Sequence, residues 1–320
     1  MDVAIGFDTS CYTTSVAVVD AGGNAILSRR MLLPVESGQR GLRQSEAVFA
    51  HVRQIPQMAA DLQTALANHT VKAVAASATP GDDEGSYMPV FTVGLGHARM
   101  LAAALQVPCY SVTHQQGHIA AGQIGQAPMA ERFVALHLSG GTTDLLLSAG
   151  GKLTPLGSSL DLHAGQLVDR VGVAMGLPFP AGAALEALAN QHAGETEALL
   201  SVSMENGDRD CHLSGAETQC QKWIAEGTLS RPQIAAEVFD VLARTATRML
   251  AAGCGYADIR QALVVGGVAS SARLRDLLVK RMRKWNRTID IRFGKPEFSA
   301  DNAAGVAWLG MQRYLAGVAE

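Results

Sequence analysis

The chain has 320 residues, of which 48% are hydrophobic and 17% are charged, and its formal net charge is −3. This composition predicts a globular protein with room for two domains, and the charge gives no overall attraction to nucleic acid. No stretch reaches the roughly 18 apolar residues that a membrane-spanning helix needs, which excludes an integral membrane protein of that kind. Because the chain begins with an alternating strand rather than a signal sequence, we expect a soluble, cytoplasmic protein.

The first half opens with a predicted three-stranded meander over residues 3–27. It consists of an apolar strand, a turn of small and hydroxyl residues that includes Asp8 and Ser10, a second strand, a Gly-Gly hairpin and a third strand. Hydrophobic periodicity then predicts helices over 52–66 and 94–105 and strands over 71–77 and 107–112.

The second half repeats this pattern. Residues 133–156 predict another meander, in which the spacing from Thr-Thr to Gly-Gly agrees with that of the first to one residue. Later elements are predicted helices over 165–175, 181–190, 232–252 and 273–284, a buried strand over 262–265 and a last helix over 302–316. The repetition indicates a duplicated α/β protein with a mixed sheet in each half. We place the domains at 1–130 and 131–320, with the last helix able to pack back on the first domain.

The cysteines give no sign of a disulfide framework or of a thiolate metal site. They are scattered and contain no CxxC pair, so we expect most of them to be small buried packing residues. The five are Cys11, Cys109, Cys211, Cys220 and Cys254.

Two glycine-rich turns in the second half are candidate phosphate-binding segments. Glycines in such turns expose successive backbone N–H groups to phosphate oxygens, and a following helix N-terminus favours an anion. The first turn comprises Leu138, Ser139, Gly140, Gly141 and Thr142, and the second includes Gly266, Gly267 and Ser271. Asp8 and Ser10, at the equivalent place in the first half, can hold a bound triphosphate from its other side. A plain hairpin and tight packing are the alternative explanations.

His114 and His118 form the candidate metal site. Four residues apart on a helix, the two imidazoles share one face and can chelate a divalent ion. They follow the strand over 107–112, at the carboxyl end where α/β proteins bind ligands. Asp301, in the turn before the last helix, is a candidate third, anionic ligand and equally a helix N-cap. Spacing alone does not decide between these two roles.

Together these motifs resemble the TsaD family of tRNA threonylcarbamoyl transferases, which belong to the ASKHA superfamily with actin, sugar kinases and heat-shock ATPases. The resemblance runs from about residue 3 to 315. The matching segments are GFDTSCYTTS at 6–15, HQQGH at 114–118, SGGTT at 139–143, DLHAGQLVDR at 161–170, PAGA at 180–183, GGVASS at 266–271 and ADNA at 300–303. The resemblance implies a duplicated actin-like fold of two mixed-sheet domains, with the active site in the cleft between them.

By this resemblance His114, His118 and Asp301 hold iron or zinc, so that Asp301 is a ligand rather than a cap. The positions that would hold ATP or the threonylcarbamoyl-adenylate are Leu138, Ser139, Gly140, Gly141, Thr142, Asp169, Gly182, Glu186 and Ser271. The implied reaction moves a threonylcarbamoyl group to the adenosine next to the anticodon of tRNA. TsaB-like and TsaE-like protein partners and a homodimer are further implications of the resemblance.

The sequence also departs from the family pattern at several substrate positions. Residues that replace the usual ones are Tyr12, Thr13, Thr142, Gln166, Glu186 and Ser271, and residues 80–85 replace a tight apolar turn with an acidic segment. We interpret the chain as a divergent paralogue. The alternatives to the tRNA reaction are a carbamoyl or phosphoryl transferase with the same metal and ATP cleft acting on another acceptor, and a non-catalytic nucleotide-binding subunit.

Overall fold

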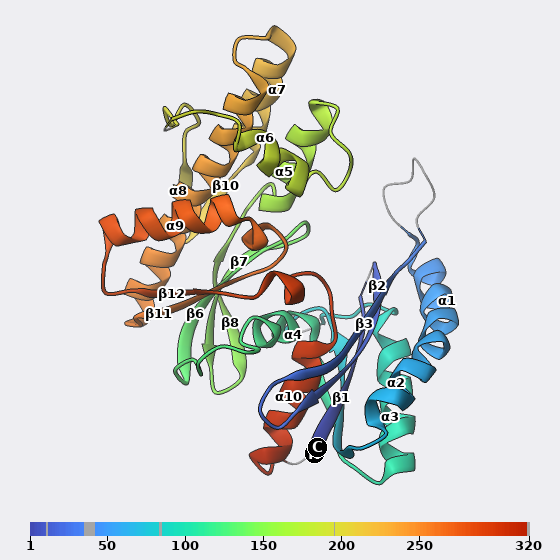
Figure 1. Ribbon diagram of the computed structural model, residues 1–320. Helices are drawn as coiled ribbons and strands as arrows, with labels where there is room; N and C mark the ends of the chain where they lie inside the picture. Colours follow the sequence, from blue (N-terminus) through green and yellow to red (C-terminus); the bar gives the residue numbers. More distant parts are fainter. Residues whose placement is uncertain (11, 35–41, 83–84, 195, 319–320) are drawn as a thin grey trace. The chain divides into compact units, whose positions relative to one another are not determined.

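The computed structural model describes residues 1–320 except 11, 35–41, 83–84, 195 and 319–320 (Figure 1). The chain forms two compact units: unit 1 contains Met1–Pro128 together with Glu297–Glu320, and unit 2 contains Met129–Pro296. The sequence-based division placed residues 131–320 in the second domain but allowed the last helix to pack back on the first, and this last segment lies in unit 1.

Unit 1 is built on a five-stranded mixed sheet with the order β3-β2-β1-β4-β5. Its strands are β1 (Asp2–Thr9), β2 (Thr13–Asp20), β3 (Ala25–Leu32), β4 (Thr70–Thr79) and β5 (Cys109–Thr113). Its helices are α1 (Gln44–Gln54), the 3-10 helix η1 (Ile55–Met58), α2 (Ala59–Leu66), α3 (Phe91–Leu105), α4 (His114–Ala121) and α10 (Ala304–Leu315). The predicted meander is confirmed, because β1, β2 and β3 pair antiparallel in sequence, and β4 and β5 continue the sheet in parallel.

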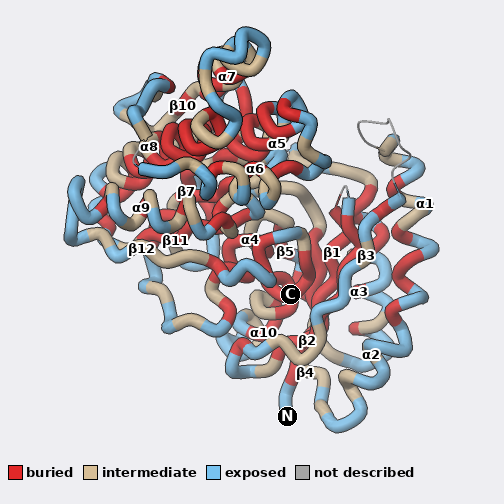
Figure 2. Tube along the Cα trace, turned by 45° about the horizontal axis from the view of Figure 1, so that its top comes forward, coloured by how far each residue is buried: buried red, intermediate tan, exposed pale blue. Residues whose placement is uncertain are grey.

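Strand β1 carries large side chains on one face and small ones on the other. Val3, Ile5 and Phe7 pack into an apolar cluster with residues of α3. On the opposite face, a Cβ atom at Gly6 would lie 2.5 Å from the carbonyl oxygen of Ala303, at the start of α10. The absence of a side chain at Gly6 therefore lets α10 lie directly on the sheet, and β1 is buried along almost its whole length (Figure 2).

Helix α10 also contacts α4 backbone to backbone. A Cβ atom at Gly305 would lie 1.9 Å from the carbonyl oxygen of Gly117 and 2.5 Å from the amide nitrogen of Ala121. Any residue larger than glycine would overlap these atoms. This contact brings the turn before α10 to the first turns of α4.

Unit 2 repeats the topology with the strand order β12-β11-β6-β7-β8. Its strands are β6 (Arg132–Leu138), β7 (Thr143–Ala149), β8 (Lys152–Ser158), β11 (Gln261–Val265) and β12 (Asp290–Phe293), with a separate hairpin of β9 (Ser203–Glu205) and β10 (Asp210–His212). Its helices are α5 (Ala164–Ala174), α6 (Gly182–Ala189), α7 (Ser214–Glu226), α8 (Arg231–Ala257), η2 (Val268–Ser270) and α9 (Ala272–Trp285), and the short η3 (Pro296–Phe298) follows. Each unit has a meander followed by two parallel strands, which confirms the predicted duplication.

The structure differs from the sequence prediction in several places. The helix expected over 52–66 begins earlier and is broken, because Pro56 stands at the start of η1 and cannot donate an amide hydrogen bond. Helix α7, the β9–β10 hairpin and strand β12 were not predicted. The described cysteines Cys109, Cys211, Cys220 and Cys254 are free, and Cys11 lies outside the described residues. None of the described helices is both long and apolar enough to cross a membrane.

The contact at Gly305 predicts a strong asymmetry between two glycine-to-alanine substitutions in helices. Gly305→Ala should lower the free energy of unfolding by at least about 2 kcal/mol, because the methyl group meets backbone atoms that cannot rotate away. Gly96→Ala in α3 has no atom within 4 Å of the new methyl group and should raise stability by about 0.5–1 kcal/mol. Urea unfolding followed by circular dichroism measures both, and equal effects would contradict the described contact.

Candidate functional site

Strand β5 leads directly into the short helix α4, which carries both histidines. Thr113 ends the strand and caps α4, accepting a hydrogen bond at Oγ1 from the backbone N–H of Gln116 at 3.1 Å. His114 is therefore the first residue of α4, and His118 follows one turn later. Their Nε2 atoms lie 3.1 Å apart. The pair shares one helix face, as its spacing predicts.

Asp301 lies beside this pair. Its Oδ1 atom is 3.2 Å from Nε2 of His118 and 3.7 Å from Nε2 of His114. The N-cap residue of α10 is Ala303, not Asp301, and Oδ1 of Asn302 accepts from the backbone N–H of Ala304 at 3.0 Å. The structure thus brings together the three residues that the sequence separates by more than 180 positions.

The three donor atoms fit a single divalent ion. Two imidazole nitrogens and one carboxylate oxygen converge with separations of 3.1, 3.2 and 3.7 Å. Ligands held at zinc or iron distances with tetrahedral angles are roughly 3.3 Å apart. Three electron-pair donors this close to one another repel unless a proton or a cation lies between them, so the donor set can hold a metal ion.

Asp8 lies behind His114 and is fully buried. Its Oδ1 atom is 2.9 Å from Nδ1 of His114 and also accepts a hydrogen bond from the hydroxyl of Ser77. A proton on Nδ1 leaves Nε2 of His114 with its lone pair directed at His118 and Asp301. Oδ2 of Asp8 is buried and has no hydrogen-bond partner among the described residues. Asp8 thus contacts His114 through Oδ1. Ser77, which the sequence analysis did not single out, donates a hydrogen bond to the same oxygen.

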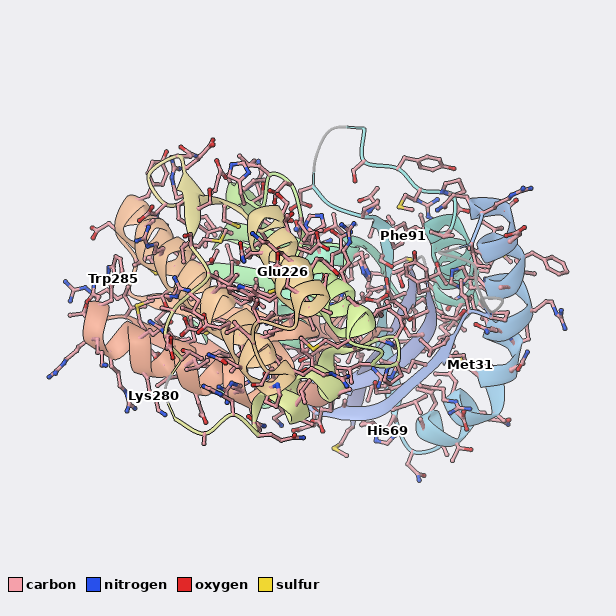
Figure 3. The ribbon with its side chains drawn as sticks, turned by 90° about the horizontal axis from the view of Figure 1, so that it is seen from above. Met31, His69, Phe91, Glu226, Lys280 and Trp285 are labelled. Atoms are coloured by element: carbon pink, nitrogen blue, oxygen red, sulfur yellow. The ribbon has the colours of Figure 1, made fainter. Side chains whose placement is uncertain are left out.

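The surroundings of the site concentrate negative charge. Burial lowers the pKa of His114, but the charges of Asp8 and Asp301 and the hydrogen bonds to them raise it well above its usual value. Burial raises the pKa of Asp301, but His114 and His118 lower it well below its usual value. The buried ring of Phe91, labelled in Figure 3, has its centroid 5.7 Å from that of His114 and excludes water from this side. A cation is the natural complement of two carboxylates around two imidazoles.

In unit 2, the first predicted glycine turn is the centre of a tightly packed group of backbone segments. The turn from Ser139 to Thr142 is closed by the hydrogen bond from the N–H of Ser139 to the carbonyl of Thr142, at 2.8 Å. A Cβ atom at Gly165, in the first turn of α5, would lie 2.6 Å from Cα of Gly140. At Gly266, which has a φ of +98°, a Cβ atom would lie 2.3 Å from the carbonyl oxygen of Leu138. The structure thus brings together both predicted turns and adds Gly165, which the sequence analysis did not single out.

Gly140 and Gly141 remain open in this group. A Cβ atom at either position would meet no atom within 4 Å, and the same holds for Gly267 in the second turn. Their backbone faces space rather than a neighbouring side chain. A phosphate can approach these N–H groups closely.

The other predicted nucleotide residues of unit 2 lie at helix starts or hydrogen-bond to them. Oδ1 of Asp169 accepts from the N–H of Ala181 at 2.7 Å, just before Gly182 begins α6, and burial raises the pKa of Asp169 although this bond lowers it. Oε1 of Glu186 accepts from the N–H of Arg273 at 2.8 Å. The hydroxyl of Ser271 caps α9 by accepting from Leu274 at 3.1 Å. These side chains each position a helix, and their contact with a nucleotide stays a prediction.

Two similarly built mixed-sheet units of this topology are also found in solved structures of kinases and related proteins. HypF from T. kodakarensis superposes with a TM-score of 0.60 at 14% identity, over 99% of this chain and 47% of HypF. A ROK family glucokinase from Streptomyces griseus, solved with glucose and AMPPNP, superposes with a TM-score of 0.54 at 17% identity, over 97% of this chain and 99% of the kinase. The chain therefore has the same duplicated, actin-like fold of two mixed-sheet α/β units.

Sequence comparison identifies the family within this class. The TsaD family, tRNA N6-adenosine threonylcarbamoyltransferase, matches residues 34–308, and the chain belongs to it. The tRNA N6-adenosine threonylcarbamoyltransferase of Thiobacillus denitrificans is 32% identical over 99% of this chain and 92% of its own length. The enzyme of the same name from Symbiobacterium thermophilum is 31% identical over 98% of this chain and 92% of its own length.

The Asp8–His114 contact predicts that metal affinity depends on Asp8. Asp8→Ala should weaken zinc binding by about 10–100-fold, because His114 loses the acceptor that fixes its tautomer. Asp8→Asn keeps an acceptor oxygen and should have a smaller effect. Asp61→Ala, on the exposed face of α2, is the matched control and should bind zinc as the unmodified protein does. Calorimetric titration with zinc measures all four, and an unchanged affinity in Asp8→Ala would contradict this role.

The glycine turns predict different consequences for two alanine substitutions in unit 2. Gly141→Ala should leave the free energy of unfolding nearly unchanged, since the methyl group meets no protein atom, but should weaken nucleotide binding if phosphate lies on the turn. Gly165→Ala should lower both stability and nucleotide binding, because it displaces Gly140. Thermal unfolding with and without ATP separates the two effects. Full ATP binding by a folded Gly141→Ala variant would place the phosphates elsewhere.

Proposed function

We propose that this protein transfers a threonylcarbamoyl group from threonylcarbamoyl-adenylate to the N6 amine of the adenosine next to the anticodon of tRNA. The observation that carries the proposal is the convergence of His114, His118 and Asp301 in a member of the TsaD family. A purely structural relative would have no need to keep three donor atoms together that come from two distant parts of the chain.

The reaction is an acyl transfer in which one bond forms and one breaks. The amine nitrogen of the adenosine forms a bond to the carbamoyl carbon, and the bond between that carbon and the phosphate oxygen breaks. AMP leaves with the electron pair, and the amine gives up one proton. Negative charge therefore develops on the carbamoyl oxygen and on the leaving phosphate, and catalysis requires groups that stabilise it.

Residues of each unit suit these requirements. A divalent ion held by His114, His118 and Asp301 would supply a Lewis acid for the carbamoyl and phosphate oxygens. Two imidazoles and one carboxylate suit iron or zinc. The open backbone of Gly140 and Gly141 offers N–H groups to the adenylate phosphate. Asp169 would accept a hydrogen bond from a ribose or substrate hydroxyl.

The protein environment of this reaction is also part of the proposal. The tRNA substrate is implied by the family. A nucleotide ligand, TsaB-like and TsaE-like partners and a homodimer stay predictions for this chain. A cytoplasmic location fits a tRNA substrate.

A second candidate function is motivated by the substituted pocket residues. Thr142 and Ser271 replace the histidine and asparagine of the family pattern, and both lie in the glycine turns of unit 2. Such changes alter the shape and hydrogen bonding of a substrate pocket while leaving the metal ligands in place. The same metal and nucleotide chemistry would then serve a different acceptor of the carbamoyl or phosphoryl group.

Complementation of cells that lack their own threonylcarbamoyl transferase tests the proposal. Expression of this chain should restore threonylcarbamoyladenosine, measured by mass spectrometry of digested tRNA. His114→Ala and Asp301→Ala should abolish the signal, because each removes a metal ligand. His97→Ala, whose ring bonds only to its own helix in the described contacts, is the matched control and should retain it. A protein that binds metal and ATP but forms no modified adenosine would favour the second candidate function.

A further inference from the structure

A chain of hydrogen bonds leads from the carboxylate of Asp301 into the core of unit 1. The carboxylate has two oxygens, and Oδ1 is the one that faces the two histidines. The other, Oδ2, accepts a hydrogen bond from the hydroxyl of Ser10 at 2.7 Å. The backbone carbonyl of Ser10 in turn accepts from Nε2 of His51, in α1, at 2.8 Å. His51 is fully buried and Ser10 nearly so.

The ring of His51 is held on both sides. The carbonyl of Ser10 can only accept, so Nε2 of His51 carries a hydrogen. On the other side, Nδ1 of His51 is 2.7 Å from Oγ1 of the buried Thr14, which is also within hydrogen-bond distance of Gln54 at 2.6 Å. Gln54 donates to the backbone carbonyl of Leu32 at 2.9 Å, the last residue of β3. The ring is therefore fixed in orientation by β2 and β3 as well as by its own helix.

The hydroxyl of Ser10 has a second acceptor within hydrogen-bond distance. Which of the two acceptors it bonds depends on the conformation of the Ser10 backbone. Besides Asp301, the backbone carbonyl of Thr13 lies 3.4 Å from Oγ of Ser10. A single hydroxyl hydrogen serves one acceptor at a time. The position of the hydroxyl follows the backbone of Ser10, whose N–H donates to the carbonyl of Thr13 at 3.2 Å. The bond from His51 holds the carbonyl of Ser10, so that this backbone is held at both of its polar groups.

We propose that His51 is a positioning residue, which through Ser10 fixes the rotation of the Asp301 carboxylate toward the metal. This inference rests on the metal site of the proposed function, but not on the identity of the acceptor. Hydrogen-bonded groups behind a metal ligand commonly change metal affinity by about 10–100-fold when they are removed. Asp8 supports His114 from one direction, and the Ser10–His51 pair supports Asp301 from another.

Metal affinity distinguishes positioning from packing. The probe is Co2+, whose visible absorption reports both binding and ligand geometry. His51→Leu removes the donor but fills the volume, and Ser10→Ala removes the hydroxyl. Each should weaken Co2+ binding by about tenfold or more and shift the visible bands in the same way. His51→Gln places an amide nitrogen near the position of Nε2 and should restore most of the affinity.

The double variant Ser10→Ala/His51→Leu gives the sharpest result. If His51 acts through Ser10, the double variant should bind Co2+ as tightly as the single variant that has the lower affinity. The reason is that either substitution alone already breaks the chain of hydrogen bonds from His51 to Asp301. Multiplied effects of the two substitutions would overturn the proposal. His97→Leu in α3 is the matched control and should keep the unmodified affinity.

Each of the remaining outcomes also supports or contradicts a stated claim. A His51→Leu variant that is less stable to heat yet binds Co2+ with unchanged affinity and spectrum has lost only a packing residue, and the proposal fails. If the unmodified protein binds no Co2+ or zinc, the metal site and this inference fail together. If the unmodified protein binds Co2+ as expected but restores no threonylcarbamoyladenosine, only the acceptor assignment fails, and the affinities still test His51.

Discussion

The candidate metal site depends on the direct backbone contact of α10 with α4 and β1. Gly305 lies against Gly117, and Gly6 lies against Ala303, so that no side chain separates these elements. This close packing brings the turn before α10 to the first turns of α4, and Asp301 reaches His114 and His118 as a consequence. The chain thereby completes, from its last segment, a site that begins at the end of β5. A slightly thicker interface would leave two histidines without a third ligand.

Near this contact, two of the three candidate metal ligands, His114 and Asp301, also form hydrogen bonds through the atoms that face away from the other ligands. Asp8 fixes His114, and Ser10 fixes the outer oxygen of Asp301. Both supporting residues stand at the end of β1, where the meander turns. The first-half turn of the duplicated fold thus contacts the candidate metal ligands. Its counterpart in unit 2, around Gly140, keeps open backbone that suits a phosphate. The two similar turns have different neighbours, and a different chemistry is proposed for each.

The sequence predicts much of this fold because its signals are local. Alternation of apolar residues marks the meanders, and spacing on a helix places His118 one turn after His114. The role of Asp301 depends on packing between α10 and α4, so local pattern left it as a ligand or a cap, and only the family motif favoured a ligand. His51 is indistinguishable by pattern from any polar residue of an amphipathic helix. The break at Pro56 was missed although proline is a local signal for it, and the short hairpin of β9 and β10 was missed because tertiary contacts outweigh propensity there.

The central claim is that one ion binds between two imidazoles and one carboxylate. Crystals of the zinc-loaded protein, measured at the zinc absorption edge, test it most directly. The account predicts one anomalous peak bonded to Nε2 of His114, Nε2 of His118 and Oδ1 of Asp301 at about 2.0–2.2 Å. A peak bonded to other residues, or no peak in crystals grown with an excess of zinc, would contradict it.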